Sequence, residues 1–469
     1  MTSLATHSRR GGFRDALRVI WPLMLSNSVH AVMQFTDRIF LSRYSDEAMQ
    51  AAVPAGTLSY LLLCVLQVTI CYSGTFVAQF HGAGRRLDCA RALTQCIWLM
   101  AVTVPLTFLG IPLGHFLMGV SGHAPEVVAT ERAYFDIMMA GGVLLPIGGA
   151  LNGYFTGRGF TKLVMWISVA GSAVNILLDW ILIYGHWGMP ELGISGAAYA
   201  TVASFALGVA VTAAIAFREP VFHGRRGRAA FAFDRSLALR IVRYGFPSGV
   251  HVLLDMLTFT FFVFVIGRED VADAMGFGAS NVCFNINHLF FAPLLGIGMG
   301  AGILVGNYQG AGDGDSANRA GWNSIFIGWI FMGTALLLLA LFFRPAVTLF
   351  LSDRTSFNPD EFIALSRILV AILSSWCMFD VVNVIAGGAL KGAGDTRFVM
   401  AAGIAAGFGL WVPMILVVAR LNPSVVNLWL TLPPYVFILA AVLLARWCRG
   451  KWRDIRLVPG KDAAGRADV

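Results

Sequence analysis

Long apolar runs separated by short polar breaks dominate this chain. Most runs reach the roughly 20 residues that a helix needs to cross a bilayer, and charged breaks such as Arg85-Arg86 bound them. The pattern predicts twelve helical spans, at about 17–42, 52–80, 93–119, 128–156, 162–186, 193–217, 241–267, 275–309, 321–350, 362–390, 397–420 and 425–447. We therefore predict an all-α polytopic membrane protein.

The composition agrees with this prediction and excludes two other classes of protein. Hydrophobic residues make up 57% of the chain and charged residues only 13%, against about 25% charged residues in ordinary soluble domains. The seven cysteines form no CxxC pair, so neither a disulfide framework nor a zinc site is expected. The net charge is positive, but the basic residues gather in the breaks between spans. No nucleic-acid partner is therefore expected.

The distribution of basic residues orients the spans. If both termini face the cytoplasm, most of the 34 Lys and Arg residues fall in cytoplasmic segments, as basic residues in membrane proteins prefer. We predict cytoplasmic tails at 1–16 and 448–469, an N-lobe at 17–217, a basic cytoplasmic linker at 218–236 and a C-lobe at 237–447.

The two halves of the chain resemble each other. VAQFHGAG at 77–84 matches VGNYQGAG at 305–312, and GYFTGRGFTK at 153–162 matches GALKGAGDTR at 388–397. WPLMLSNSVH at 21–30 lines up with FPSGVHVLLD at 246–255. Two six-span halves with the same orientation are parallel repeats, which secondary transporters use to enclose a site that each side of the membrane reaches in turn.

Four carboxylates lie inside apolar spans: Asp37, Asp179, Asp255 and Asp380. A helix rises about 1.5 Å per residue, so distance along the chain from the basic residues at the span ends gives each acid a depth. Asp37 and Asp179 fall at one level in the outer part of the first half. Asp255, counted from Arg243, and Asp380, counted from Lys391, share a level near the middle of the second half.

The first-half acids have neighbours suited to a hard cation. Asn175 and Asp179 stand four residues apart and project from one face of their helix, and Thr201 of the next span offers a hydroxyl. Such oxygens suit Na⁺, or a proton held between carboxylates. The alternative is that these acids are helix-end residues that reach the outer interface.

Three further residues within spans are candidates for a role. His251 lies four residues before Asp255 and would share its face, which suits either a proton relay or an ordinary hydrogen-bonded packing residue. Pro22 and Pro247 occupy equivalent places in the first and seventh spans. Each could kink its helix, although membrane helices tolerate proline in general.

Taken together, the order and spacing of these residues resemble the multidrug and toxic compound extrusion (MATE) family, in its norfloxacin-exporter-like branch. The resemblance rests on P-x₁₄-D (Pro22, Asp37), N-x₃-D (Asn175, Asp179) and G-x-P-x₇-D (Gly245 to Asp255). It extends to DVVNVIAGGALKGAGDT at 380–396 and covers about residues 15–450.

The resemblance implies a V-shaped fold of two six-helix lobes with a central cavity, and export of amphipathic, often cationic drugs in exchange for H⁺ or Na⁺. It implies an N-lobe cation site at Asp37, Asn175, Asp179 and Thr201, and a C-lobe cation site at Asp255 and Asp380. The expected protein is a multi-pass monomer of the bacterial cytoplasmic (inner) membrane. Neither enzymatic activity nor a cofactor is expected, and any bound metal would be Na⁺ at the same carboxylates.

Two departures from the family pattern leave the coupling ion open. Arg38 follows Asp37 where a small or hydroxylated residue is common, and Asp255 stands where Glu is frequent. A lipid-linked oligosaccharide flippase of the same superfamily is the alternative, with a channel or a membrane enzyme ranked lower. GAGDGD at 310–315 is no phosphate loop, because no Lys-Ser/Thr follows it.

Overall fold

The computed structural model describes residues 10–268, 270–348 and 358–458, and these are almost entirely helical. Ten of the described helices or helix pairs are long and apolar enough to cross a membrane, and an eleventh span is formed by a pair of helices that meet at a 41° bend. Helix α2 (Phe13–Tyr44) has 32 residues but is not in that set, since polar residues such as His30 and Gln34 lower its hydropathy. With α2 counted, the helices match the twelve predicted spans in order.

The described helices form two compact units. Of the described residues, the first unit comprises 25–253, 306–312 and 457–458; the second comprises 10–24, 254–268, 270–305, 313–348 and 358–456. The division cuts α2 after Met24 and α11 (Arg235–Ile266) after Leu253. The units thus differ from the predicted lobes at the start of each half. The predicted terminal tails lie partly outside the described residues.

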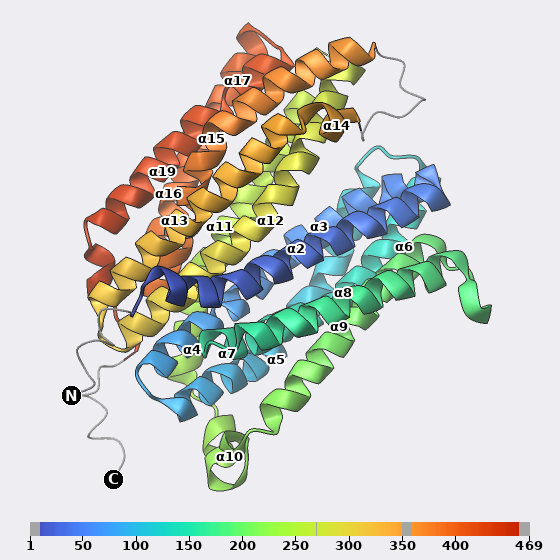
Figure 1. Cartoon of the computed structure of the whole chain (residues 1–469). Coiled ribbons are helices and arrows are strands. Elements are labelled where there is room, and N and C mark those ends of the chain that lie inside the picture. The colour runs from blue at the N-terminus through green and yellow to red at the C-terminus, as the bar shows by residue number, and fades with distance from the viewer. Residues whose placement is uncertain (1–9, 269, 349–357, 459–469) are drawn as a thin grey trace. The chain divides into compact units, whose positions relative to one another are not determined.

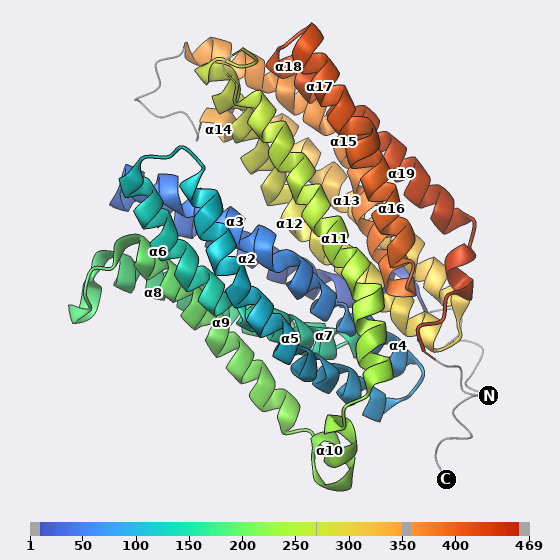
Figure 2. The same cartoon turned by 180° about the vertical axis from the view of Figure 1, so that it is seen from behind.

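The first unit contains most of the helices of the first half. They are α3 (Asp46–Cys71), α4 (Ser73–Gly82), α5 (Arg86–Gly119), α6 (Pro125–Gly142), α7 (Leu144–Gly157), α8 (Thr161–Tyr184), η1 (His186–Gly188), α9 (Gly193–Phe217), η2 (Pro220–Phe222) and α10 (Gly224–Phe231). Helices α8 and α9 run side by side in both views (Figures 1 and 2). The bend lies between α6 and α7.

The second unit contains the helices of the second half. They are α12 (Ala274–Gly310), α13 (Gly314–Leu341), α14 (Phe343–Thr348), α15 (Pro359–Ala393), α16 (Thr396–Ala406), η3 (Gly407–Trp411), α17 (Val412–Leu421), α18 (Val425–Trp429), α19 (Leu432–Cys448) and η4 (Lys451–Asp454). Helix α15 packs against both α13 and α19 (Figure 1). Five residues of π-helix, Gly407–Trp411, interrupt the eleventh span.

The predicted basic linker is folded rather than extended. Its helix α10 lies against α5, where the Thr94 hydroxyl donates to the Ala230 carbonyl at 2.5 Å. The indole of Trp98 donates to the Phe231 carbonyl at 3.0 Å. These bonds from α5 satisfy carbonyls at the end of the short helix, which has no further turn to accept them.

Glycines of the repeat mark a close helix crossing in the first unit. Gly74 on α4 faces Gly153 and Gly157 on α7. A Cβ atom added to Gly74 would lie 3.0 Å from the Gly153 Cα, and one added to Gly157 would lie 2.7 Å from the Gly74 carbonyl oxygen. Such distances leave no room for a side chain, so these two helices pack backbone to backbone.

The second unit repeats this contact with the equivalent residues. Gly302 on α12 faces Gly388 and Gly392 on α15, and a Cβ atom added to Gly302 would lie 2.9 Å from the Gly388 carbonyl oxygen. A Cβ atom added to Gly392 would collide with the Gly302 backbone. Gly388 and Gly392 are the residues that the sequence repeat aligns with Gly153 and Gly157. The repeat therefore preserves a specific helix crossing in both halves.

Candidate functional site

Two helices of the first unit bring two carboxylates together. Asp37 comes from α2 and Asp179 from α8, and their carboxyl groups interact directly. Asp179 and Asn175, one turn apart on α8, are both 0% exposed. We call these three residues the Asp37–Asp179 cluster. The structure thus brings together the two acids that chain distance placed at one level; their depth in a membrane stays a prediction.

The polar atoms of this cluster are short of hydrogen-bond partners. Both side-chain atoms of Asn175 and both carboxylate oxygens of Asp179 are buried without a hydrogen bond of normal geometry, and so is one oxygen of Asp37. Leaving a buried polar group unsatisfied costs about 1–3 kcal/mol. The cluster is therefore a buried group of oxygen and nitrogen atoms that lack hydrogen-bond partners within the protein.

Tyr134 on α6 was missed in the sequence analysis. The structure places it within electrostatic range of both Asp37 and Asp179. Its neighbour Asp136 points elsewhere and lies 2.6 Å from the His115 ring nitrogen, with a side chain 46% exposed. A tyrosine in the outer half of a span is a weak signal, because tyrosines are common near both membrane interfaces.

Two other residues expected near the cluster have different surroundings. The Thr201 hydroxyl donates to the Ala197 carbonyl of its own helix, α9, at 3.0 Å. It is therefore already bonded within the helix. Arg38 is exposed, yet its charge acts on Asp37.

The second unit also joins two helices through acids. Asp255 on α11 and Asp380 on α15 lie within electrostatic range of each other. The Asn383 amide donates to an Asp380 carboxylate oxygen at 3.4 Å and to the Val436 carbonyl at 3.3 Å. Asp255 lies deep among the helices, although its side chain is exposed. The second pair thus differs from the first in having one exposed acid, Asp255, and an amide donor.

Lys391 changes the electrostatics of this second pair. It lies deep in the second unit, within electrostatic range of Asp255. Lys391 lies in the last turn of α15, which ends at Ala393, and the chain turns at Gly394 (φ 103°). We call Asp255, Asp380 and Lys391 the Asp255–Lys391 cluster. It contains its own cation.

The remaining candidates lie on the two long proline-containing helices. His251 precedes Asp255 by one turn of α11, so the two share a helix face; its relay role stays a prediction. Pro22 and Pro247 are buried inside α2 and α11. Each precedes, by a few residues, the point at which its helix passes from one compact unit to the other.

No metal cluster of three or more His, Cys, Asp or Glu side chains occurs among the described residues. What the Asp37–Asp179 cluster offers is two carboxylates and an amide oxygen, a donor set suited to a proton or a hard monovalent cation.

Comparison with known proteins identifies the family. The MatE family model matches residues 22–181 and 247–417, one segment in each half. A probable multidrug resistance protein NorM of Bradyrhizobium diazoefficiens is 27% identical over 93% of both chains. The multidrug resistance protein PmpM of Pseudomonas aeruginosa is 26% identical over 86% of this chain and 83% of its own.

Solved structures show the same fold. An outward-facing multidrug resistance MATE family transporter of the MOP superfamily superposes with a TM-score of 0.80 at 20% identity, over 96% of this chain and 99% of its own. A MOP superfamily transporter from Pyrococcus furiosus gives 0.81 at 21% identity, over 97% and 99%. This twelve-helix, multi-pass membrane protein, whose two halves each match the family model, belongs to the MatE family.

Proposed function

We propose that the chain is a secondary active multidrug efflux antiporter, which exports amphipathic, often cationic compounds in exchange for H⁺ or Na⁺ by alternating access. One observation carries the antiport part of this proposal. Asp37 and Asp179 face each other in a buried site beside an amide that has no partner. A site of this kind needs a proton or a cation to balance its charge.

The coupling follows from competition between two ligands for two arrangements of the protein. A cation between Asp37 and Asp179 stabilises the arrangement in which both carboxylates face it. Bound drug favours the other arrangement, and the ion is released as the drug is taken up. A ligand shifts such an equilibrium only by its difference in affinity for the two states, so the carboxylates must lose part of their contact in one state.

The prolines of α2 and α11 fit this scheme. Pro22 and Pro247 each interrupt a backbone hydrogen bond of a long helix, close to where that helix changes unit. Bending at these points changes the direction of the helix segments that carry Asp37 and Asp255 relative to the segments that precede the prolines. The proposal includes cytoplasmic termini, an inner-membrane location, a monomeric state and a central drug cavity between two lobes.

Ethidium efflux from energised vesicles tests the proposal. Wild type is compared with Asp37→Asn, Asp179→Asn, Asp255→Asn and Asp380→Asn. Asp136→Asn is the matched control, because Asp136 is an acid of the same half that lies outside both clusters. We expect efflux to fall in the cluster variants and to persist in the control. Undiminished efflux in all four would contradict the proposal.

The coupling ion requires a separate measurement. Efflux by the wild type is recorded with Na⁺ removed and then with the pH gradient collapsed. Loss of efflux in only the first case assigns Na⁺, and loss in only the second assigns H⁺. A third measurement removes Na⁺ and collapses the pH gradient together. Efflux that persists under this condition would exclude antiport with either ion.

A further inference from the structure

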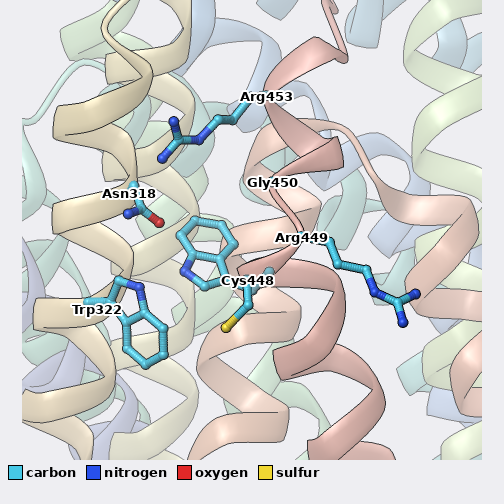
Figure 3. A pocket seen from close by; sticks show the side chains of 7 residues that line it. Asn318, Trp322, Cys448, Arg449, Gly450 and Arg453 are labelled. Atoms are coloured by element: carbon cyan, nitrogen blue, oxygen red, sulfur yellow. The ribbon is translucent and has the colours of Figure 1, made fainter.

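A pocket that the transport proposal does not use opens at one end of the second unit. It lies where the last span ends. Its lining consists of Asn318 and Trp322 of α13, together with residues 447–450 and Arg453 from the C-terminal end of the described chain (Figure 3). Its volume of about 510 Å³ falls within the range of roughly 300–1,000 Å³ typical of small-ligand sites. The described acids of both clusters are absent from its lining.

The wall of the pocket contains a buried donor without an acceptor. Trp447 is 1% exposed, and its indole nitrogen has no hydrogen-bond partner. Trp452 stacks on it with the ring planes 4° apart and centroids at 4.3 Å, and the indole of Trp452 donates to the Trp447 carbonyl at 3.0 Å. Of the two stacked indoles, only that of Trp447 is left unsatisfied.

The packing fixes the direction of that donor. Gly321 on α13 lies against the indole edge of Trp447, so that an added Cβ atom would lie 3.0 Å from the ring carbon that carries the nitrogen. Gly321 stands between Asn318 and Trp322 along α13. The indole of Trp447 is thus packed against α13, the helix that carries Asn318 and Trp322, and Trp447 itself lines the pocket.

The charge of the pocket is basic. In Figure 3 the Arg453 guanidinium points toward Asn318, whereas Arg449 extends away from both α13 side chains. Arg453 lies 3.3 Å from an oxygen of Asp315, whose side chain is 83% exposed. Such an exposed ion pair contributes only about 0–1 kcal/mol. Arg453 can therefore exchange this carboxylate for an anion that also accepts from other donors.

We propose that this pocket binds the phosphate of an anionic phospholipid head group. The Trp447 N–H and the Asn318 amide donate to phosphate oxygens, and Arg453 pairs with the negative charge, a geometry that guanidinium and phosphate favour. Trp322, 38% exposed and part of the pocket lining, provides the indole beside which the lipid chains lie. Basic pockets between spans recognise lipid head groups in this way.

Cys448 provides a probe at the pocket itself. All seven cysteines lie within the described residues, and of these Cys448 is the exposed one. It also lines the pocket. The rate at which a maleimide labels Cys448 therefore reports whether the pocket is occupied.

The experiment uses the full chain in neutral detergent, with phosphatidylglycerol, phosphatidylcholine or inorganic phosphate added. A lipid that blocks the pocket slows labelling as 1 + [L]/Kd, or about tenfold at ten times Kd. We expect phosphatidylglycerol to slow the reaction and the other two additions to leave it unchanged. Arg453→Ala and Trp447→Phe should remove the protection, whereas Arg225→Ala, an exposed arginine of α10, should keep it.

Each contrary result is decisive. Equal protection by phosphatidylcholine would show that the pocket does not distinguish an anionic from a zwitterionic lipid. Equal protection by inorganic phosphate would make the ligand a soluble anion rather than a lipid. Protection that survives in Arg453→Ala would place the lipid elsewhere. Because Arg453 is exposed, that variant should fold even if Trp447→Phe does not.

Discussion

The two acidic clusters occupy corresponding halves of the chain but differ in how their charge is balanced. In the Asp37–Asp179 cluster the acids face each other, Asn175 has no partner, and the nearest cation is the exposed Arg38. The Asp255–Lys391 cluster contains a deep ammonium group and the bonded Asn383. Under the proposed antiport, the first cluster takes its cation from outside, whereas the second has Lys391 within electrostatic range of Asp255.

This difference predicts unequal effects when one acid is removed from each cluster. Asp179→Asn should reduce energised ethidium efflux by about 5–150-fold, the range of a coupling free energy of 1–3 kcal/mol. Asp380→Asn should reduce it less, because Lys391 and Asp255 still balance each other. Efflux rates at matched expression check the order. A larger loss in Asp380→Asn would assign the coupling to the second unit.

Removing the internal cation should destabilise the second unit. Lys391→Met leaves Asp255 without its ammonium neighbour, and adding Asp255→Asn should recover about 0.5–3 kcal/mol of the lost free energy of unfolding. Thermal unfolding of the detergent-solubilised variants measures this double-mutant cycle. Lys162→Met, an exposed lysine at the start of α8, is the control. Additive effects of the two changes would show that Lys391 and Asp255 do not interact.

Replacing Asn175 and Asn383 by leucine should change the free energy of unfolding in opposite directions. Asn175→Leu removes two unsatisfied polar atoms and should raise the free energy of unfolding by about 1–3 kcal/mol while it lowers efflux. Asn383→Leu breaks the bonds to Asp380 and the Val436 carbonyl and should lower stability. Thermal unfolding and efflux are measured on both variants. If Asn175→Leu lost stability, Asn175 would be a packing residue instead of a ligand.

The glycine crossings should respond alike in both halves. Gly157→Ala and Gly392→Ala each force a methyl group into the opposite backbone and should cost about 1–3 kcal/mol of stability. Gly171→Ala and Gly409→Ala meet no atom within 4 Å and serve as controls. Midpoints of thermal unfolding check this. A loss at only one of the two crossings would mean that the halves do not share this packing.

Arg38 should have the smallest effect. Because its side chain is exposed, its interaction with Asp37 is screened, and Arg38→Gln should change stability by less than about 1 kcal/mol. The measurable consequence is a weaker dependence of efflux on ionic strength than in the wild type. An efflux loss as large as that of Asp179→Asn would show that Arg38 belongs to the ion site.

The sequence could predict the spans and the pairing of acids because both follow from one-dimensional distances. Apolar run length sets the spans, and rise per residue sets the depth at which Asp37 meets Asp179. The linear pattern does not show that Lys391 lies within electrostatic range of Asp255, since that proximity joins α15 to α11. The linear pattern likewise does not show that Tyr134 lies near both acids, or that the Thr201 hydroxyl is bonded to the Ala197 carbonyl.

By itself, the sequence determined the membrane class, the internal repeat and which polar residues lie within apolar spans, because hydrophobic length and periodicity are properties of the chain alone. Only the tertiary structure decided which of these residues meet. It joined Asp37 to Asp179, placed Lys391 beside Asp255, and left the Trp447 indole unsatisfied in a basic pocket. Those outcomes depend on how helices distant in sequence cross, and the positions of their crossings are set by packing at residues such as Gly157 and Gly392.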